Sequence, residues 1–543
     1  MAAPGTTEAA PRPEPSLARS TAVMSLGTII SRLTGVVRLA VLAAALGVAE
    51  THMADAYNLA NTVPNIIYEL VLGGVITSVF VPTFVELIEK EDRERAWEVF
   101  SGILNVSLLA LAVVAIIGVA AAPWIASFYS SRLHGADAAA QQHAIEFLLR
   151  LFIPQIVLYG LYFIVAGLIN AHRRYGPPMF TPIVNNLVLI GVLVAFAALY
   201  GRVTPRTATT TQLLILGLGT TASVAPMGLL LLPYLRRLGR WRPTLAIGHP
   251  SVKRLARLSA FVVGMVVANQ VGAVVIQYLA SGQRGGYTAY IAAQTFFLMP
   301  LGLFVWSINT ALLTPMSEHA VHQRWDAFRD RVSTGVRAVV FLMVPTTIGF
   351  IVLAEPIVRL LIQHGEATRQ STDVVVPVLR VFMLGLLQFS LFQLFVRAFY
   401  AMHDTRTPFW INCGVVAINI AINVPMYAAF KVEGLAAGQA IAYTAGIVAQ
   451  GILLGRRIGG IESKRVARST VRVLAAGAAM GVVVWEALAV VRRVIDSASI
   501  PAQLAAVVVP VAVGAVVFLG AAWLLRIEEL GFVRGILARK LRT

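Results

Sequence analysis

The chain has 543 residues, of which 58% are hydrophobic and 13% charged, and its formal net charge is +18. Soluble domains carry roughly 25% charged residues, so a chain this apolar lacks the polar groups to cover a water-exposed surface. The composition excludes a soluble protein and indicates a polytopic membrane protein. The positive charge lies in the loops, where it sets topology and contacts anionic phospholipids rather than nucleic acid.

Apolar segments follow one another along nearly the whole chain, and a helix needs about 20 such residues to cross a bilayer. A disordered cytoplasmic tail is predicted at 1–20 and a basic cytoplasmic tail at 527–543. Pro154 and Pro300 fall inside predicted spans, where kinks are expected. The fourteen predicted spans are 21–47, 54–87, 98–128, 140–171, 178–201, 210–235, 256–282, 287–317, 334–362, 373–402, 407–430, 434–456, 468–491 and 501–526.

Loops rich in Lys and Arg alternate along the chain with loops poor in them. The loop after the first span has neither, the loop after the second has Lys90, Arg93 and Arg95, and the most basic segment, 236–257, lies near the middle. Cytoplasmic loops are enriched in these residues, so an even number of spans with both termini in the cytoplasm is predicted. We expect an N-terminal lobe at 21–240, a C-terminal lobe at 250–456 and a final pair of spans at 464–526, because transporters often pack two bundles around a midplane site.

The first span contains Arg32 and Arg38, both within apolar sequence. A guanidinium stays charged at physiological pH and costs several kcal/mol at bilayer depth on most scales. The two side chains are about 9 Å apart along a helix and point in different directions, and Gly35 between them is expected to permit a bend that turns both toward one cavity. The pair favours a hydrated interior that binds an anion. The alternative is that the side chains reach the membrane surface.

The second span has one polar face on an apolar helix, because its polar residues recur at three- and four-residue spacing. Such a face packs inward or lines water, which makes it a candidate binding surface. Asp55 has the alternative role of capping its own helix, and Glu69 is predicted to pair with an arginine of the first span. The candidate residues are Asp55, Asn58, Asn61, Asn65 and Glu69.

Later spans contain amides and a few cations. Asn419 and Asn423 lie one turn apart and, with Asn269, form a candidate site for a monovalent cation such as Na⁺; hydrogen bonding between helices is the alternative. Arg397 is expected to extend to the cytoplasmic surface.

The catalytic motifs of soluble enzymes are absent from the sequence. Cys413 is the single cysteine, which excludes an internal disulfide and a thiolate cluster, and there is neither a phosphate-binding GxxxxGK[ST] loop nor a zinc HExxH motif. We therefore expect a transporter without a bound cofactor or metal, driven by Na⁺ or by the membrane potential.

Nine stretches of the chain resemble the MurJ/MviN lipid II flippases of the MOP (multidrug, oligosaccharidyl-lipid, polysaccharide) exporter superfamily. The resemblance runs from the first span to the eleventh, and the fourteen predicted spans agree with it. The stretches are SRLTGVVR at 31–38, DAY at 55–57, PN at 64–65, AAPW at 121–124, GLINAHRR at 167–174, PPMFTPIVNN at 177–186, PMSE at 315–318, QHG at 363–365 and FYAMHDTRTP at 399–408.

The resemblance implies a transporter, not an enzyme, with two lobes around a cationic cavity. It would move lipid II, an undecaprenyl diphosphate carrying the peptidoglycan disaccharide-peptide, from the inner to the outer leaflet of the bacterial cytoplasmic membrane, alongside cell-wall synthesis proteins. The matching Arg32 and Arg38 would bind the diphosphate, and Asp55 matches an important acidic position.

The chain also departs from the family pattern. The family implies further charges where this chain has Tyr68, Gly73 and 294–295. Either another cation, Arg380 or Arg284, replaces the missing one, or the substrate is gripped differently. The alternatives are an exporter of another lipid-linked saccharide or of cationic drugs, which a cationic cavity would repel, and a cell-wall scaffold that transports nothing.

Overall fold

The computed structural model describes residues 17–72, 93–133, 137–172, 174, 176–239, 241–244, 250–494 and 499–531. Every regular element in these ranges is a helix, as the sequence predicts. The helices of the first half are α1 (Leu17–Leu46), α2 (Met53–Leu72), α4 (Arg93–Ser130), α5 (Ala138–Phe152), α6 (Gln155–Ala171), α7 (Gly176–Tyr200), α8 (Thr210–Leu229) and α9 (Leu232–Leu238).

The second half begins with the longer helix α10 and includes a short π-helical segment, η2. Its elements are α10 (Pro250–Ala280), α11 (Gly286–Pro300), η2 (Leu301–Val305), α12 (Trp306–Val321), α13 (Trp325–Leu361), α14 (Arg369–Leu384), α15 (Leu386–Ala401), α16 (Arg406–Ile458), α17 (Ser463–Val494) and α18 (Ile500–Leu524).

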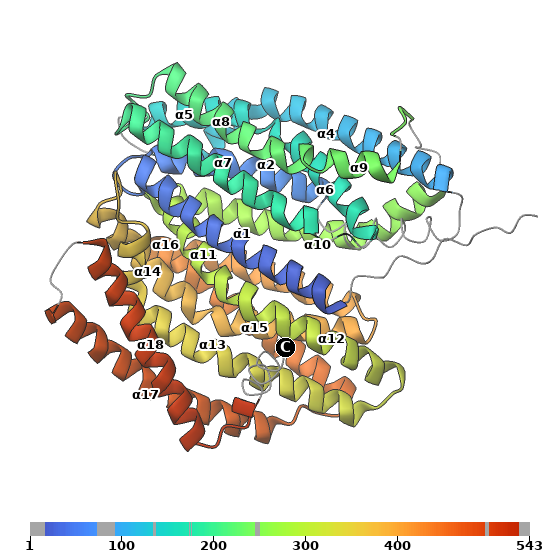
Figure 1. Ribbon diagram of the computed structural model, residues 1–543, viewed down its shortest axis with the longest axis vertical. Helices are drawn as coiled ribbons and strands as arrows, with labels where there is room; N and C mark the ends of the chain where they lie inside the picture. Colours follow the sequence, from blue (N-terminus) through green and yellow to red (C-terminus); the bar gives the residue numbers. More distant parts are fainter. Residues whose placement is uncertain are drawn as a thin grey trace, which may run out of the picture.

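The helices form two groups with a further pair on the outside (Figure 1). In the first group, α1 packs against α7, α2 against α5, and α7 against α8. In the second group, α10 and α15 pack against α16, and α11 packs against α14. Helices α17 and α18 pack on each other and on α13, at the edge of the second group that is farther from the first (Figure 1).

The predicted spans correspond to described helices. Among the described residues, eleven helical stretches are long and apolar enough to cross a membrane, and α14 with α15, bent by 43°, makes a twelfth. Helix α16 has 53 residues and non-helical backbone at Lys431, so it holds two of the predicted spans. Helix α2 accounts for the last one, since its described part, Met53–Leu72, begins a predicted span that continues to residue 87 outside the described residues.

Local sequence explains several helix ends. Pro154 separates α5 from α6 and Pro300 ends α11, as expected of proline, whereas Pro64 lies within continuous α2. Thr209 and Gln212 form a capping box at the start of α8. Of the predicted terminal tails, 1–16 and 532–543 lie outside the described residues, as does Gly73, and α1 already begins at Leu17, inside the range predicted to be disordered.

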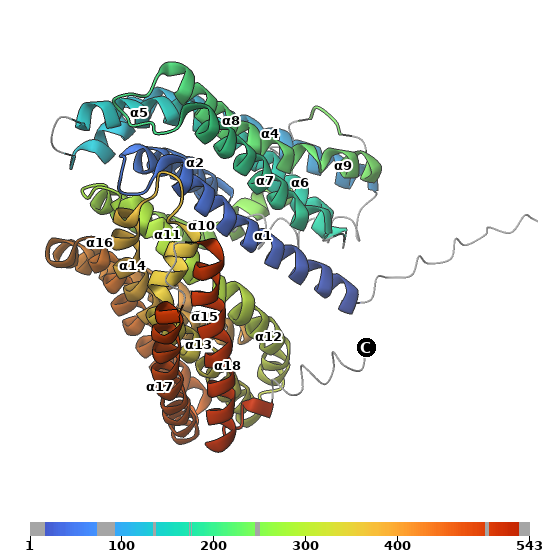
Figure 2. The same cartoon turned by 60° about the vertical axis from the view of Figure 1, so that its left-hand side comes forward.

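Contacts between the two groups gather at one end of the bundle, which we call the closed end. It comprises the helix ends and connections at 46–53, 280–286 and 361–369, and the groups spread apart away from it (Figure 2). Gly285 has φ +68°, and a Cβ there would lie 2.7 Å from the Val48 carbonyl oxygen. The backbone N–H of Glu366 donates to the Ala44 carbonyl at 2.8 Å. A residue with a side chain at position 285 would force the groups apart.

Candidate functional site

Arg32 and Arg38 line the same cavity, which has a volume of about 500 Å³. Its walls come from α1, α2, α6, α7, α8 and α11, and no Asp or Glu lies among the described residues that line it. α1 is one unbroken helix, so the cavity reaches both side chains without the bend expected at Gly35, which itself lines the wall. The polar lining residues are Thr28, Ser31, Arg32, Arg38, Tyr57, Asn58, Asn61, Tyr159, Tyr162, Asn185, Asn186 and Thr295.

The two guanidinium groups have different neighbours. Arg38 lies within electrostatic reach of the hydroxyls of Tyr57 and Tyr159. The Nε atom of Arg32 would lie 3.5 Å from a Cβ on Gly302, in the π-helical segment of the second group. Within the described ranges, neither arginine forms a salt bridge, so both charges remain available to an anion in the cavity.

Helix α7 positions α1 beside this cavity. The amide of Asn186 donates to the Ser31 carbonyl at 3.3 Å and to the Thr34 hydroxyl at 3.0 Å. Asn185 also lines the cavity, but its amide contacts Met227 of α8. The face of α7 that carries Asn186 therefore packs against α1 beside the cavity.

The polar face of α2 does not act as a single surface. Asn58 and Asn61 line the cavity, but Asn65 lies outside it and donates to the Asn61 carbonyl at 3.0 Å. Glu69 also lies outside and accepts a hydrogen bond from Gln270 of α10, which corrects the predicted pairing with an arginine of α1. The 3.6-residue period places these side chains on one side of α2, but different helices pack against that side along its length.

Asp55 belongs to the closed end and lines neither large cavity. It is 1% exposed, and its carboxylate accepts hydrogen bonds from the backbone N–H of Gly285 at 2.7 Å and from the N–H and hydroxyl of Thr288 at 2.9 and 2.7 Å. Asp55 thus caps the first turn of α11 in the opposite group rather than its own helix. The structure gives it a role in holding the groups together.

Glu50, which the sequence analysis missed, makes a similar connection to α14. Its carboxylate accepts hydrogen bonds from the backbone N–H groups of Thr368 and Ser371 at 2.7 and 3.1 Å and from their hydroxyls at 2.7 and 2.5 Å. Burial opposes ionisation, but the bonds from Ser371, Thr368 and Val48 outweigh it and lower the pKa of Glu50 to about 2. The only signal in the sequence is that Glu50 is the sole acid in a loop without Lys or Arg.

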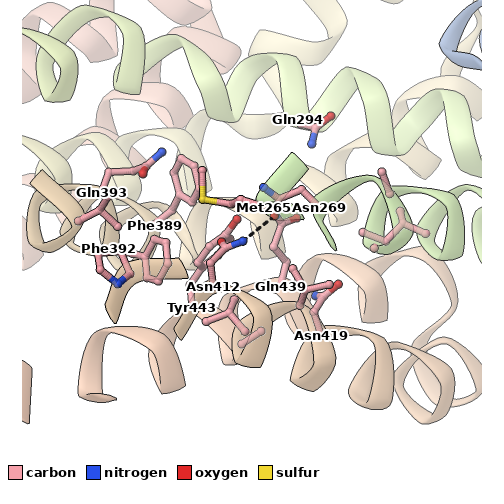
Figure 3. Close-up of a pocket in the computed structure, with 18 of the residues that line it drawn as sticks. Met265, Asn269, Gln294, Phe389, Phe392, Gln393, Asn412, Asn419, Gln439 and Tyr443 are labelled. Carbon is pink, nitrogen blue, oxygen red and sulfur yellow. Dashed lines mark hydrogen bonds between the residues drawn. The ribbon is translucent and has the colours of Figure 1, made fainter. Parts of the chain in front are cut away.

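A second cavity, of about 510 Å³, is lined mainly by the second group of helices, with Thr62 of α2 as the described contribution of the first group. Of the predicted ion site, Asn269 and Asn419 line it, but Asn423 is fully buried behind the wall and donates to Asn419 at 2.9 Å. Asn269 accepts a hydrogen bond from Asn412 instead (Figure 3). In the part of the chain that the structure describes, no group of three or more His, Cys, Asp or Glu could hold a metal ion.

The expected replacement cations do not reach either cavity. Arg284 is exposed at the closed end and donates to the Glu50 carbonyl, while Arg380 is exposed on α14 and donates to the Ile351 carbonyl at 3.2 Å. Arg397, which was expected to extend to the membrane surface, instead lines the second cavity. Tyr68 is stacked between Tyr159 and Phe163, so an aromatic cluster occupies the place where the family resemblance implies a charge.

A family model described as "Lipid II flippase MurJ" matches residues 42–517 of the chain. The chain belongs to the lipid II flippase MurJ family. Membership confirms the predicted class, a membrane transporter and not an enzyme, and the predicted function of a lipid II flippase at the level of the family.

Curated proteins from several bacteria are similar to this MurJ family member over most of its length. A probable lipid II flippase MurJ of Rhizobium meliloti is 28% identical over 438 residues, which cover 79% of this chain and 78% of that protein. A probable lipid II flippase MurJ of Rhizobium tropici is 27% identical, and the matched residues cover 87% of this chain and 88% of that protein. The lipid II flippase MurJ of Burkholderia cenocepacia is 26% identical, with 74% and 77% covered.

Solved structures show the same fold. A lipid II flippase MurJ in an inward closed conformation superposes with a TM-score of 0.74 at 19% identity, covering 95% of this chain and 100% of that one. An inward-facing multidrug MATE transporter of the MOP superfamily gives a TM-score of 0.64 at 12% identity, covering 81% and 98%. The MurJ family member thus has the helical architecture shared with MOP transporters, as predicted.

Proposed function

We propose that this chain moves lipid II from the inner to the outer leaflet of the bacterial cytoplasmic membrane by alternating access, with Arg32 and Arg38 binding the diphosphate. The proposal rests mainly on one observation: both guanidinium groups line one cavity, and none of the described residues that line it is acidic. Guanidinium N–H groups form a planar fork that matches phosphate oxygens. Keeping such charges at bilayer depth is costly unless an anion or water meets them.

The size of the cavity supports binding of the headgroup rather than the lipid tail. A volume of about 500 Å³ is within the range of small-molecule sites, about 300–1,000 Å³, and its polar lining suits a diphosphate and sugar. The apolar tail would remain in the bilayer, where its burial costs nothing. Asn58, Asn61 and Asn186 would orient the headgroup through hydrogen bonds.

We assign the closed end to the outer side of the membrane, with both termini in the cytoplasm. The connections at this end include 47–52, which has no Lys or Arg, whereas Arg174 and Arg457 lie at helix ends on the other side. Basic loops favour the cytoplasm and its anionic phospholipids. The cavity with Arg32 and Arg38 would then load from inside.

The two groups of helices would act as the two lobes of the transport cycle. Opening outward requires the hydrogen bonds of Glu50 and Asp55 to α14 and α11 to break while new contacts close the inner side. The membrane potential favours outward movement of an anion, by about 2.3 kcal/mol per charge per 100 mV, and an Na⁺ gradient is the alternative source. Cell-wall synthesis proteins that use lipid II outside would be the partners downstream.

Vesicles that contain the purified protein and fluorescent lipid II test the proposal. We expect Arg38→Gln and Arg32→Gln each to slow lipid II translocation at least tenfold, since a hydrogen bond to a charged group contributes about 1.5–3 kcal/mol. Arg380→Gln, which removes an exposed cation outside both cavities, should leave the rate unchanged.

Wild-type rates in both cavity variants, with normal insertion, would refute the diphosphate site. Transport of another lipid-linked saccharide but not of lipid II would indicate a different exporter. No transport at all, with cell-wall synthesis still dependent on the chain, would indicate a scaffold.

A further inference from the structure

The second cavity has a composition that an ion site alone does not explain. Its volume of about 510 Å³ matches that of the cavity with Arg32 and Arg38. Among the described residues, six carboxamide side chains line it, along with several aromatic rings and one arginine, and none of these lining residues is Asp or Glu. Figure 3 shows most of these amides around the cavity; they are Asn269, Gln294, Gln393, Asn412, Asn419 and Gln439.

This composition favours one chemical class of ligand. Amide side chains both donate and accept hydrogen bonds, and aromatic faces cover the apolar side of a peptide or sugar. A cavity with one cation and no lining acid disfavours cationic ligands. A chain rich in amide groups that carries a carboxylate satisfies all three features.

Arg397 supplies the positive charge. It is half-buried on α15, and its guanidinium lies 5.8 Å from the centre of the Trp306 ring and 6.0 Å from that of Tyr400. Within the described ranges no carboxylate forms a salt bridge with it. The rings hold the guanidinium in place, and its N–H donors are not taken up by a partner acid.

Asn309 of α12 provides a second, independent observation. Its side chain is 4% exposed, and its Oδ1 atom accepts no hydrogen bond from any residue in the described part of the chain. Asn309 lines a small recess together with Gln393 and Arg397. A buried acceptor without a donor is costly, so a ligand N–H in this recess would satisfy it.

The two cavities lie on adjacent faces of α11. Gln294 lines the second cavity, the adjacent Thr295 lines the first, and Ile291 belongs to both walls. Gly302 of the π-helical segment faces Arg32, and Trp306, the first residue of α12, faces Arg397, so this stretch of backbone lies between residues that line the two cavities.

We propose that the second cavity binds the peptide part of the lipid II headgroup, with Arg397 pairing with a peptide carboxylate and Asn309 accepting a peptide N–H. This inference rests on the proposed function, in which Arg32 and Arg38 hold the diphosphate. The headgroup is then gripped at both ends, by a diphosphate site in one lobe and a carboxylate site in the other. Substrate binding thereby connects the two lobes that must move.

The test compares the affinity of the full chain in nanodiscs for two ligands. They are lipid II and lipid II whose peptide carboxyl groups are all converted to carboxamides. We expect the wild-type protein to bind the acid form about tenfold more tightly, as a charge-assisted hydrogen bond implies. Arg397→Gln should remove this preference, and Arg397→Lys should keep part of it.

Matched variants separate this site from the diphosphate site. Arg38→Gln should weaken binding of both ligands by the same factor, because both retain the diphosphate. Arg380→Gln should change neither affinity. Asn309→Asp, nearly equal in size, places an acid beside Arg397 and should lower affinity for the acid form more than for the carboxamide form.

Equal wild-type affinities for the two ligands, or equal weakening of both by Arg397→Gln, would overturn the proposal. Binding of a soluble disaccharide-peptide, which lacks both the diphosphate and the lipid tail, distinguishes failure of this inference from failure of the proposed function. If lipid II does not bind but this fragment binds in an Arg397-dependent way, the peptide site stands and the flippase proposal fails. If neither binds, both fail.

Discussion

The Glu50 carboxylate is the strongest single connection that we describe between the two lobes at the closed end, and neutralising it should shift the conformational equilibrium. Four hydrogen bonds from Thr368 and Ser371 cross between the lobes at 2.5 to 3.1 Å. Glu50→Gln keeps the shape but replaces one acceptor oxygen by an NH₂ group that faces donors. Hydrogen bonds to a charged group contribute about 1.5–3 kcal/mol each, but water replaces them in the open state, so we assign about 2 kcal/mol to the change.

A loss of about 2 kcal/mol corresponds to a roughly 30-fold increase in the population open at this end. Labelling of a reporter cysteine by a membrane-impermeant maleimide measures it. Ser281, which is 2% exposed in the connection between α10 and α11, is a suitable position for Ser281→Cys, after Cys413→Ser removes the native thiol. We expect labelling of this reporter to be on the order of tenfold faster or more in Glu50→Gln, with Glu50→Asp intermediate.

Glu433, an acid whose side chain forms no salt bridge with any described residue, offers a matched control. Glu433→Gln changes the net charge by the same amount and should leave labelling unchanged. Labelling in Glu50→Gln at the wild-type rate, in a protein that folds normally, would refute the reasoning that this carboxylate holds the lobes together.

Three further predictions concern the pH dependence of the Glu50 contact and two contacts elsewhere. The pKa of Glu50 is lowered to about 2 in the closed state, so its contribution to the stability of the closed state should be fully present above about pH 4.5 and be lost as pH falls toward 2. The difference in labelling rate between the wild type and Glu50→Gln should therefore be constant from pH 8 to 5 and shrink below pH 5. A difference that grows on acidification would contradict this. Tyr68→Arg disrupts a stacked aromatic cluster and should lower the thermal unfolding midpoint, while Tyr68→Phe should not. Equal midpoints for Tyr68→Arg and the wild type would show that a cation fits at this position. Arg337→Met removes the guanidinium partner of the 2%-exposed Glu529, which retains a hydrogen bond from the Ser469 hydroxyl, and should destabilise the protein by about 3–5 kcal/mol in thermal unfolding. Adding Glu529→Leu should recover much of this loss. No recovery would mean that the pair does not anchor the segment after α18 to α13.

The number and order of the helices were predictable because crossing a bilayer is a local requirement. Each span must satisfy its own backbone hydrogen bonds over about 20 apolar residues, so length and composition suffice. The sequence was less informative on where a helix bends. Gly35 causes no bend although it lies between two charges, whereas the break of α16 at Lys431, where φ is 52°, falls in the gap predicted between the spans 407–430 and 434–456.

Half of the candidate site was predictable in the same way. Arg32, Arg38, Asn58 and Asn61 had to avoid lipid, and the structure places all four on one cavity. For polar residues farther along α2, the cost of exposure to lipid predicts only that their side chains face the interior of the protein. Whether an inward position meets a cavity or another helix depends on the neighbour, which is why Glu69 contacts Gln270 instead of an arginine.

The sequence by itself determined a helical membrane protein with charges that must lie inside it. Only the tertiary structure decided which distant segment meets each polar group. Asp55 contacts the start of α11, 230 residues away, and Glu50 contacts the start of α14, more than 300 residues away. Arg397 similarly faces a cavity rather than the surface. The physical reason is that the cost of exposing a charge to lipid is set locally, whereas the group that satisfies the charge comes from whichever helix packs beside it.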